Sequence, residues 1–165
     1  MKDYDAALDF FFREYGDVAD KDRMAIYGWS FGGYMTLSML LKSKYEFRVG
    51  VAGGAVVDWR YYEVMYTERY MGVRNLENES YYEACDIKHD LHRLHTPLCL
   101  IHCNHDNVVL DIHPASLLDC ANKKCKNSSL IEYYLFFGHG HNVTGTERLE
   151  LMHKVESQIE KYIKH

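Results

Sequence analysis

The segment Gly28-Trp29-Ser30-Phe31-Gly32-Gly33 constrains the backbone more than any other part of the sequence. It follows a short apolar stretch, 24–27, and precedes a Met- and Leu-rich stretch, 34–41, that carries no charge until residue 42. This pattern predicts a strand, a sharp turn and a buried helix. We expect a side chain at either glycine flanking Ser30, Gly28 or Gly32, to collide with the neighbouring strand or helix.

The rest of the chain alternates between the two kinds of periodicity. Apolar or β-branched runs at 47–52, 98–102 and 131–137 predict three more strands, and helical spacing is clear at 4–15, 112–125 and in the last 20 or so residues. The aromatic stretch 59–70 is predicted to be a helix or helical hairpin. Alternating strands and helices predict an α/β fold, a mainly parallel sheet with helices on both faces, and residues 1–165 are expected to form one folding unit.

The turn also has the G-x-S-x-G pattern of a nucleophile elbow, which holds a serine between a strand and a helix. In such a turn the backbone N–H of Phe31 would face a developing oxyanion, and the dipole of the following helix would add to its effect. Ser30 is therefore the candidate nucleophile. The alternative is a glycine-rich turn whose serine has no chemical role.

A serine hydroxyl needs a base and a carboxylate that orients the base. Asp106 follows the predicted strand 98–102, and His141 follows the predicted strand 131–137, so both are expected at strand ends in the order Ser, Asp, His. Alternatively, His139 could be the base, and Asp106 could only close an Asx-turn. A Zn²⁺ site is a third alternative because His102, Cys103, His105, His139 and His141 gather at two strand ends, but their spacing fits no standard framework, and no metal or other cofactor is expected.

A further segment carries a resemblance to a known family. Residues Trp59-Arg60-Tyr61-Tyr62-Glu63 and Tyr66-Thr67-Glu68-Arg69-Tyr70-Met71-Gly72 closely resemble the aromatic specificity segment of dipeptidyl peptidase IV-like members of the prolyl oligopeptidase family. The elbow, the stretch from Leu100 through Asp106 to Val109, and the loop ending in His141 match in the same order. The resemblance covers nearly the whole chain.

The resemblance implies a serine peptidase with an α/β-hydrolase fold that cuts peptide bonds after Pro or Ala through an acyl-enzyme. Ser30, Asp106 and His141 would be its triad, and the residues lining the pocket for the residue before the cut bond would be Phe31, Val56, Trp59, Tyr62, Tyr66 and Val109. An apolar, aromatic-walled pocket suits a proline ring, although an aromatic stripe is more often ordinary core. The chain departs from the family pattern at Phe31, Cys103, Val108 and Asn142.

By the same resemblance the fold is incomplete, because the early strands, the tyrosine that serves as a second oxyanion donor, and an N-terminal β-propeller would precede this chain. Residues 1–165 would then be the C-terminal part of a catalytic domain, weakly active or inactive alone, with a homodimer possible by analogy. An esterase of the same fold and a non-enzymatic remnant or interaction module are the alternatives to the peptidase.

Composition excludes some partners. The net charge is only −5 and the 19 basic residues are scattered, so no nucleic-acid footprint is expected. No stretch approaches the length of an apolar membrane span, and the acidic, amphipathic first residues are not expected to act as a secretion signal. The compartment stays open between cytoplasmic and periplasmic or secreted. Three possible glycosylation triplets begin at Asn78, Asn127 and Asn142.

Overall fold

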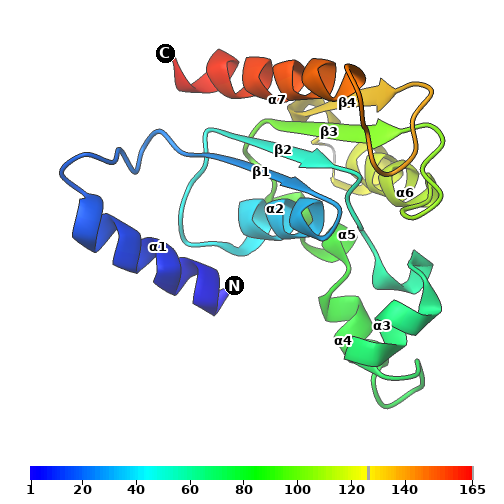
Figure 1. Ribbon diagram of the computed structural model, residues 1–165. Coiled ribbons are helices and arrows are strands. Elements are labelled where there is room, and N and C mark those ends of the chain that lie inside the picture. Colours follow the sequence, from blue (N-terminus) through cyan, green and yellow to red (C-terminus); the bar gives the residue numbers. More distant parts are fainter. Residues whose placement is uncertain (126, 165) are drawn as a thin grey trace.

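A computed structural model describes residues 1–125 and 127–164, and its centre is a parallel sheet of four strands in the order β1-β2-β3-β4 (Figure 1). The strands are β1 (Ala25–Trp29), β2 (Val49–Gly53), β3 (Leu98–Cys103) and β4 (Ile131–Phe136). Each strand pairs with the next one along the chain. The carboxyl ends of all four strands therefore meet at one edge of the sheet, which is where parallel sheets place reactive groups.

Helices cover both faces, as the sequence predicts. On one face α2 (Phe31–Lys42), α5 (Ile87–Asp90) and α6 (Ile112–Cys120) contribute to a core with Leu98 and Leu100 of β3. On the other face α7 (Glu147–Ile163) packs on Cys99 and Ile101 of the same strand. Alternate residues of one strand thus enter opposite cores, which confirms a sheet buried on both sides.

The aromatic segment and the residues after it form three short elements. These are the 3₁₀ turn η1 (Trp59–Tyr61), helix α3 (Val64–Met71) and helix α4 (Glu79–Ala84). Further short turns are η2 (Leu91–Arg93), η3 (Ala121–Cys125) and η4 (Ser128–Leu130). Helices α3 and α4 project from the carboxyl side of the sheet (Figure 1). The sequence predicts a helix or helical hairpin at 59–70, where η1 and α3 lie, but it gives no signal for the short α4 and α5.

Helix α1 (Lys2–Tyr15) forms as predicted, but it buries none of its residues completely. It lies beside the sheet, below the edge strand β1 in the view of Figure 1. Asp9 anchors it by accepting hydrogen bonds from Lys44 Nζ (2.7 Å) and Tyr45 Oη (2.7 Å), and the Phe12 ring stacks on Tyr45. The aromatic side chains on its outer face, including Phe10 and Phe11, stay exposed.

None of the helices in residues 1–125 and 127–164 combines the length and apolar character needed to cross a bilayer.

Candidate active site

Ser30 lies directly after β1 and directly before α2, at the carboxyl edge of the sheet. Its φ of 60° makes it the one non-glycine residue with positive φ among the described residues, a conformation that costs about 1–3 kcal/mol. Its N–H donates to Gly53 O (2.8 Å), and its own carbonyl accepts the first hydrogen bond of α2, from Tyr34 N (3.1 Å). The backbone therefore holds the serine rigidly on both sides.

Helix α2 begins at Phe31, three residues earlier than the sequence pattern predicts. The positive φ of Ser30 reverses the chain in a single residue, so the glycines after it already belong to the helix. The N–H groups of Phe31, Gly32 and Gly33 precede the first hydrogen bond of the helix and are available to a ligand or to water. This is the arrangement that favours a negative charge at a helix N-terminus.

The glycines of the turn differ in how much room they have. A Cβ on Gly28 would lie 2.1 Å from Gly32 O, and one on Gly33 would lie 2.8 Å from Gly53 O, whereas one on Gly32 would meet nothing within 4 Å. The prediction that a side chain at position 28 would collide is confirmed. The same prediction for position 32 is wrong, because Gly32 occupies an open position on the first turn of α2. Gly33 is the second crowded glycine instead.

This contrast predicts opposite effects for two matched substitutions. Gly28→Ala is expected to lower the free energy of unfolding by more than about 4 kcal/mol or to prevent folding, since the new methyl group meets backbone that cannot move away. Gly32→Ala is expected to be neutral or stabilising by roughly 0.5–1 kcal/mol, because alanine favours a helix. Urea unfolding followed by circular dichroism measures both; equal effects would contradict the turn geometry.

Asp106 lies in the loop after β3, and each of its carboxylate oxygens has a separate task. Oδ1 accepts hydrogen bonds from the backbone N–H of Val108 (3.0 Å) and Val109 (2.9 Å), and Oδ2 lies 2.7 Å from His141 Nδ1. The side chain is fully buried. Burial acts to raise the pKa of Asp106, but the hydrogen bonds from His141, Val109 and Val108 outweigh it and leave the pKa below its ordinary value. Asp106 thus closes a turn and also binds an imidazole.

His141 follows β4 and reaches the same edge. Trp29 Nε1 donates to its carbonyl (3.0 Å), and its ring lies against Gly54, where a Cβ would be 3.2 Å from His141 Cε1. Trp29 is the residue before Ser30, and Gly54 is the residue after Gly53, whose carbonyl accepts the hydrogen bond from Ser30 N. Both contacts therefore hold the imidazole beside the serine turn. Within residues 1–125 and 127–164 no hydrogen bond joins Ser30 Oγ to His141, which is common in a site without substrate.

The alternative base, His139, occupies a different position. Its ring packs on Phe136 at 5.1 Å, and its carbonyl accepts from His105 N (3.0 Å). The structure thus brings Asp106 to His141 and not to His139. It also gathers no group of three or more His, Cys, Asp or Glu side chains that could hold a metal ion in the part of the chain that it describes.

Two further contacts tie the acid loop to the base loop. Asn104 N donates to Phe136 O (3.1 Å), and Gly138 N donates to Asn104 Oδ1 (2.7 Å). Together with the bond between His105 and His139, they brace the loop after β3 against the loop after β4. The sequence gives no sign of these bonds, nor of the one from Trp29, because they join residues that lie far apart in the chain.

The predicted pocket residues meet around Trp59. Its ring centroid lies 6.1 Å from Phe31, 5.6 Å from Tyr62 and 5.9 Å from Tyr66, on which it stacks. Val56 and Val109 pack in the same cluster but are 1% and 0% exposed, so they lie beneath the rings. Tyr34, which the sequence analysis does not include, joins the cluster 5.1 Å from Trp59. Phe31 is the link to the serine turn, since it is the next residue after Ser30.

An ion network holds the aromatic segment in place. Asp58 accepts from Arg60 Nη2 (2.7 Å) and Lys88 Nζ (2.8 Å), and Arg60 also binds Asp86 (2.6 Å). Asp58 is fully buried, and burial alone would raise its pKa. The hydrogen bonds from Arg60 and Lys88 have the larger combined effect and lower the pKa of Asp58 to about 2. Asp58 and Arg60, the neighbours of Trp59 in the sequence, are thereby fixed to α5 and to its N-cap residue Asp86.

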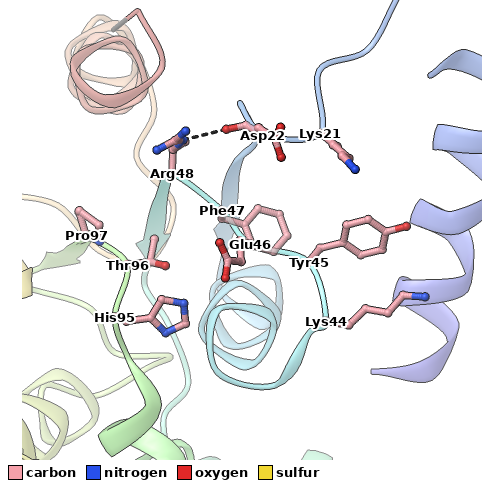
Figure 2. Close-up of a pocket in the computed structure, with 10 residues that line it drawn as sticks. All are labelled: Lys21, Asp22, Lys44, Tyr45, Glu46, Phe47, Arg48, His95, Thr96 and Pro97. Carbon is pink, nitrogen blue, oxygen red and sulfur yellow. Dashed lines mark hydrogen bonds between the residues drawn. The ribbon is translucent and has the colours of Figure 1, made fainter. Parts of the chain in front are cut away.

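A cavity of about 680 Å³ lies at the opposite edge of the sheet, among the segments that enter β1, β2 and β3 (Figure 2). There Arg48 Nε donates to Asp22 O (2.7 Å), and Figure 2 shows Tyr45 and Lys44 extending towards α1. None of Ser30, Asp106 and His141 lines this cavity. Because it is at the amino ends of the strands, it is separate from the candidate active site.

Comparisons with known proteins identify the family of this chain. The model of the prolyl oligopeptidase family matches residues 1–165. The chain belongs to the prolyl oligopeptidase family. Within that family it is 34% identical over 125 residues to a probable dipeptidyl-aminopeptidase B of Neurospora crassa, covering 75% of this chain and 14% of the relative. It is 46% identical over 66 residues to human dipeptidyl peptidase 8, covering 40% of this chain and 7% of the relative.

Solved structures of the family show the same architecture. A Bacteroides ovatus protein assigned as a dipeptidyl aminopeptidase IV superposes with a TM-score of 0.79 at 36% identity over 87% of this chain and 20% of its own. Porphyromonas gingivalis dipeptidyl peptidase 4 gives a TM-score of 0.75 at 26% identity with the same coverage. These matches confirm an incomplete α/β-hydrolase fold, and the chain spans about one fifth or less of the length of these prolyl oligopeptidase relatives.

Proposed function

We propose that Ser30, Asp106 and His141 form the catalytic triad of a serine peptidase. The observation that carries the proposal is the 2.7 Å contact between Asp106 Oδ2 and His141 Nδ1 at the sheet edge where the strained Ser30 turn lies. An Nδ1–H that donates to the carboxylate leaves Nε2 with a free lone pair, which is the state a general base needs.

The reaction then follows from the positions of the groups. His141 Nε2 takes the proton of Ser30 Oγ as the oxygen attacks the substrate carbonyl, and the backbone N–H of Phe31 donates to the oxyanion that forms. The C–N bond breaks as His141 gives its proton to the leaving amine, which leaves an acyl group on Ser30. Water, deprotonated by the same imidazole, attacks this ester and releases the acid.

We further propose that the protein removes dipeptides by cutting after Pro or Ala. The support is the aromatic cluster beside Ser30 and the names of the relatives, which are dipeptidyl peptidases or dipeptidyl-aminopeptidases. A proline ring has no N–H to satisfy once it is within a peptide, so rings such as Trp59 and Tyr66 can enclose it without an unpaired donor.

The chain spans 14% of one relative and 20% of the compared structures, so we assign this activity to a longer protein of which residues 1–165 are the C-terminal part of the catalytic domain. In that protein the preceding segments would supply the second oxyanion donor and the propeller, and peptides would be the substrates. A missing oxyanion donor lowers the rate by roughly 10²–10³, so the 165-residue chain alone is expected to be slow.

A pocket substitution separates peptidase from esterase. Tyr66→Ala should lower kcat/KM for an Ala-Pro p-nitroanilide by roughly 10- to 200-fold, because a pocket contact is worth 1–3 kcal/mol to a substrate that uses it. A short-chain p-nitrophenyl ester, which does not fill the pocket, should change little. Tyr81→Ala is the control, since this tyrosine is 64% exposed on α4. Ester turnover that exceeds Ala-Pro turnover, with both equally affected by Tyr66→Ala, would favour an esterase.

A further inference from the structure

Two thiols outside the candidate active site lie within contact distance of each other. Cys120 Sγ and Cys125 Sγ are 3.6 Å apart, and both cysteines are free. Cys120 is the last residue of α6, and Cys125 ends η3, which follows α6 without a break. The pair is on the side of the molecule covered by α6, away from the carboxyl-edge loops of Asp106 and His141.

The local backbone explains the approach of the two sulfurs. In an α-helix with 3.6 residues per turn, side chains five positions apart point about 140° away from each other. Residues Ala121–Cys125 instead form a turn of π-helix, whose hydrogen bonds span five residues. The wider turn brings Cys125 back over Cys120.

The two thiols differ in exposure. Cys120 is 7% exposed and donates to Lys88 O at 3.7 Å. Burial, followed by the hydrogen bond with Cys125, raises the pKa of Cys120 to about 11. Cys125 is only partly buried. Cys125 is thus the thiol that an outside reagent meets first.

A cavity of about 520 Å³ adjoins Cys120 and Lys124, the residue before Cys125, and offers room for the body of such a reagent. Cys120 and Lys124 line it together with charged side chains of both signs, namely Arg60 of η1, Asp86, Lys88 of α5 and Asp119 of α6. A wall with both signs of charge suits a zwitterionic molecule. Oxidised glutathione has this character, since each half carries an ammonium group and carboxylates.

We propose that Cys120 and Cys125 form a modification site that reacts with a small-molecule disulfide and closes into an intrachain disulfide. The Cys125 thiolate attacks one sulfur of the reagent, the S–S bond of the reagent breaks, and one small thiolate leaves. Cys120 then loses its proton and attacks Cys125 Sγ, which releases the second small thiol. The two cysteines lose two electrons and two protons in total, and the reagent gains them.

The test treats the folded, reduced protein with oxidised glutathione and maps the products by mass spectrometry. Trypsin cleaves after Lys123 and Lys124, between the two cysteines, so the disulfide appears as two joined peptides. We expect this linkage to form in the wild type while Cys99 and Cys103, each 1% exposed, stay reduced.

Single variants check the order of the steps. In Cys120→Ser the resolving thiol is missing, so Cys125 should accumulate as a mixed disulfide with glutathione. In Cys125→Ser the buried Cys120 should remain a free thiol. The proposal is overturned if the wild type ends as mixed disulfides without the linkage, if the linkage forms only in urea, or if Cys120 is modified in Cys125→Ser.

Discussion

Ser30→Ala is expected to abolish labelling by a fluorophosphonate probe, which the wild-type chain should take up at Ser30 alone. Such probes need an activated serine oxygen and not a pocket filled by peptide, so they test the triad within these 165 residues. In the longer peptidase the same substitution should lower kcat by roughly 10⁶-fold, the size seen when a triad nucleophile is removed. Ser30→Ala removes one hydroxyl from a half-buried residue whose backbone hydrogen bonds remain, so it is not expected to change the fold.

Labelling is read by mass spectrometry, and circular dichroism shows that the protein is folded. Ser80→Ala is the matched control, because Ser80 is an exposed serine on α4, and it should be labelled like the wild type. A folded wild-type chain that takes up no probe would show that the serine is not activated in this chain. Probe found on Ser30→Ala would show that another residue is the nucleophile.

Asp106→Asn is expected to lower kcat/KM by roughly 10⁴-fold, because an asparagine here would fix the wrong tautomer of the base. The backbone N–H groups of Val108 and Val109 both donate to Oδ1, so the amide oxygen must take that place. The amide NH₂ then faces His141 Nδ1, which must accept. Nε2 is left protonated and cannot take the proton of Ser30.

The same substitution has a pH-dependent effect on stability. The folded protein holds the pKa of Asp106 below its ordinary value, so the ionised carboxylate stabilises the fold above the unfolded pKa, and this stability is lost as the pH falls through the folded pKa. Asp106→Asn should therefore be less stable than the wild type at neutral pH and approach it in acid. Asp111→Asn is the control, since Asp111 is exposed and its side chain caps nothing. Equal activity of Asp106→Asn and Asp111→Asn would remove Asp106 from the triad.

Local sequence pattern was sufficient for most of the sheet. The strand predicted at 98–102 is β3 (Leu98–Cys103), within which Cys99 and Cys103 are both buried. All four strands were predictable because each is a short apolar run and helical spacing separates one run from the next, whereas their order in the sheet comes from the structure alone. Local pattern does not show how many residues a turn takes. Because Ser30 has a positive φ, the turn is one residue long, so α2 begins at Phe31 instead of residue 34 and Gly32 lies in an open position.

The site shows the same division. Ser30, Asp106 and His141 were candidates because each follows a predicted strand, and parallel topology brings strand ends together. The supports around them were not predictable, because they depend on contacts between distant residues, such as Trp29 with His141 or Arg60 with Asp86. The family resemblance supplied Trp59, Tyr62 and Tyr66, while Tyr34 became visible only once α2 and η1 were packed together.

The hydrogen bonds between the loops after β3 and β4 have a mechanical consequence. Since Asn104 and His105 fasten the first loop to the second, the carboxylate and the imidazole should shift together as one rigid body when a bound peptide presses on that end of the sheet. Ser30 is held separately, by its connection to β1 and by the hydrogen bond from its N–H to the carbonyl of Gly53. The bond from Trp29 Nε1 to the His141 carbonyl joins the carboxylate–imidazole pair to the serine turn, so acid, base and nucleophile should move as one unit under such a load.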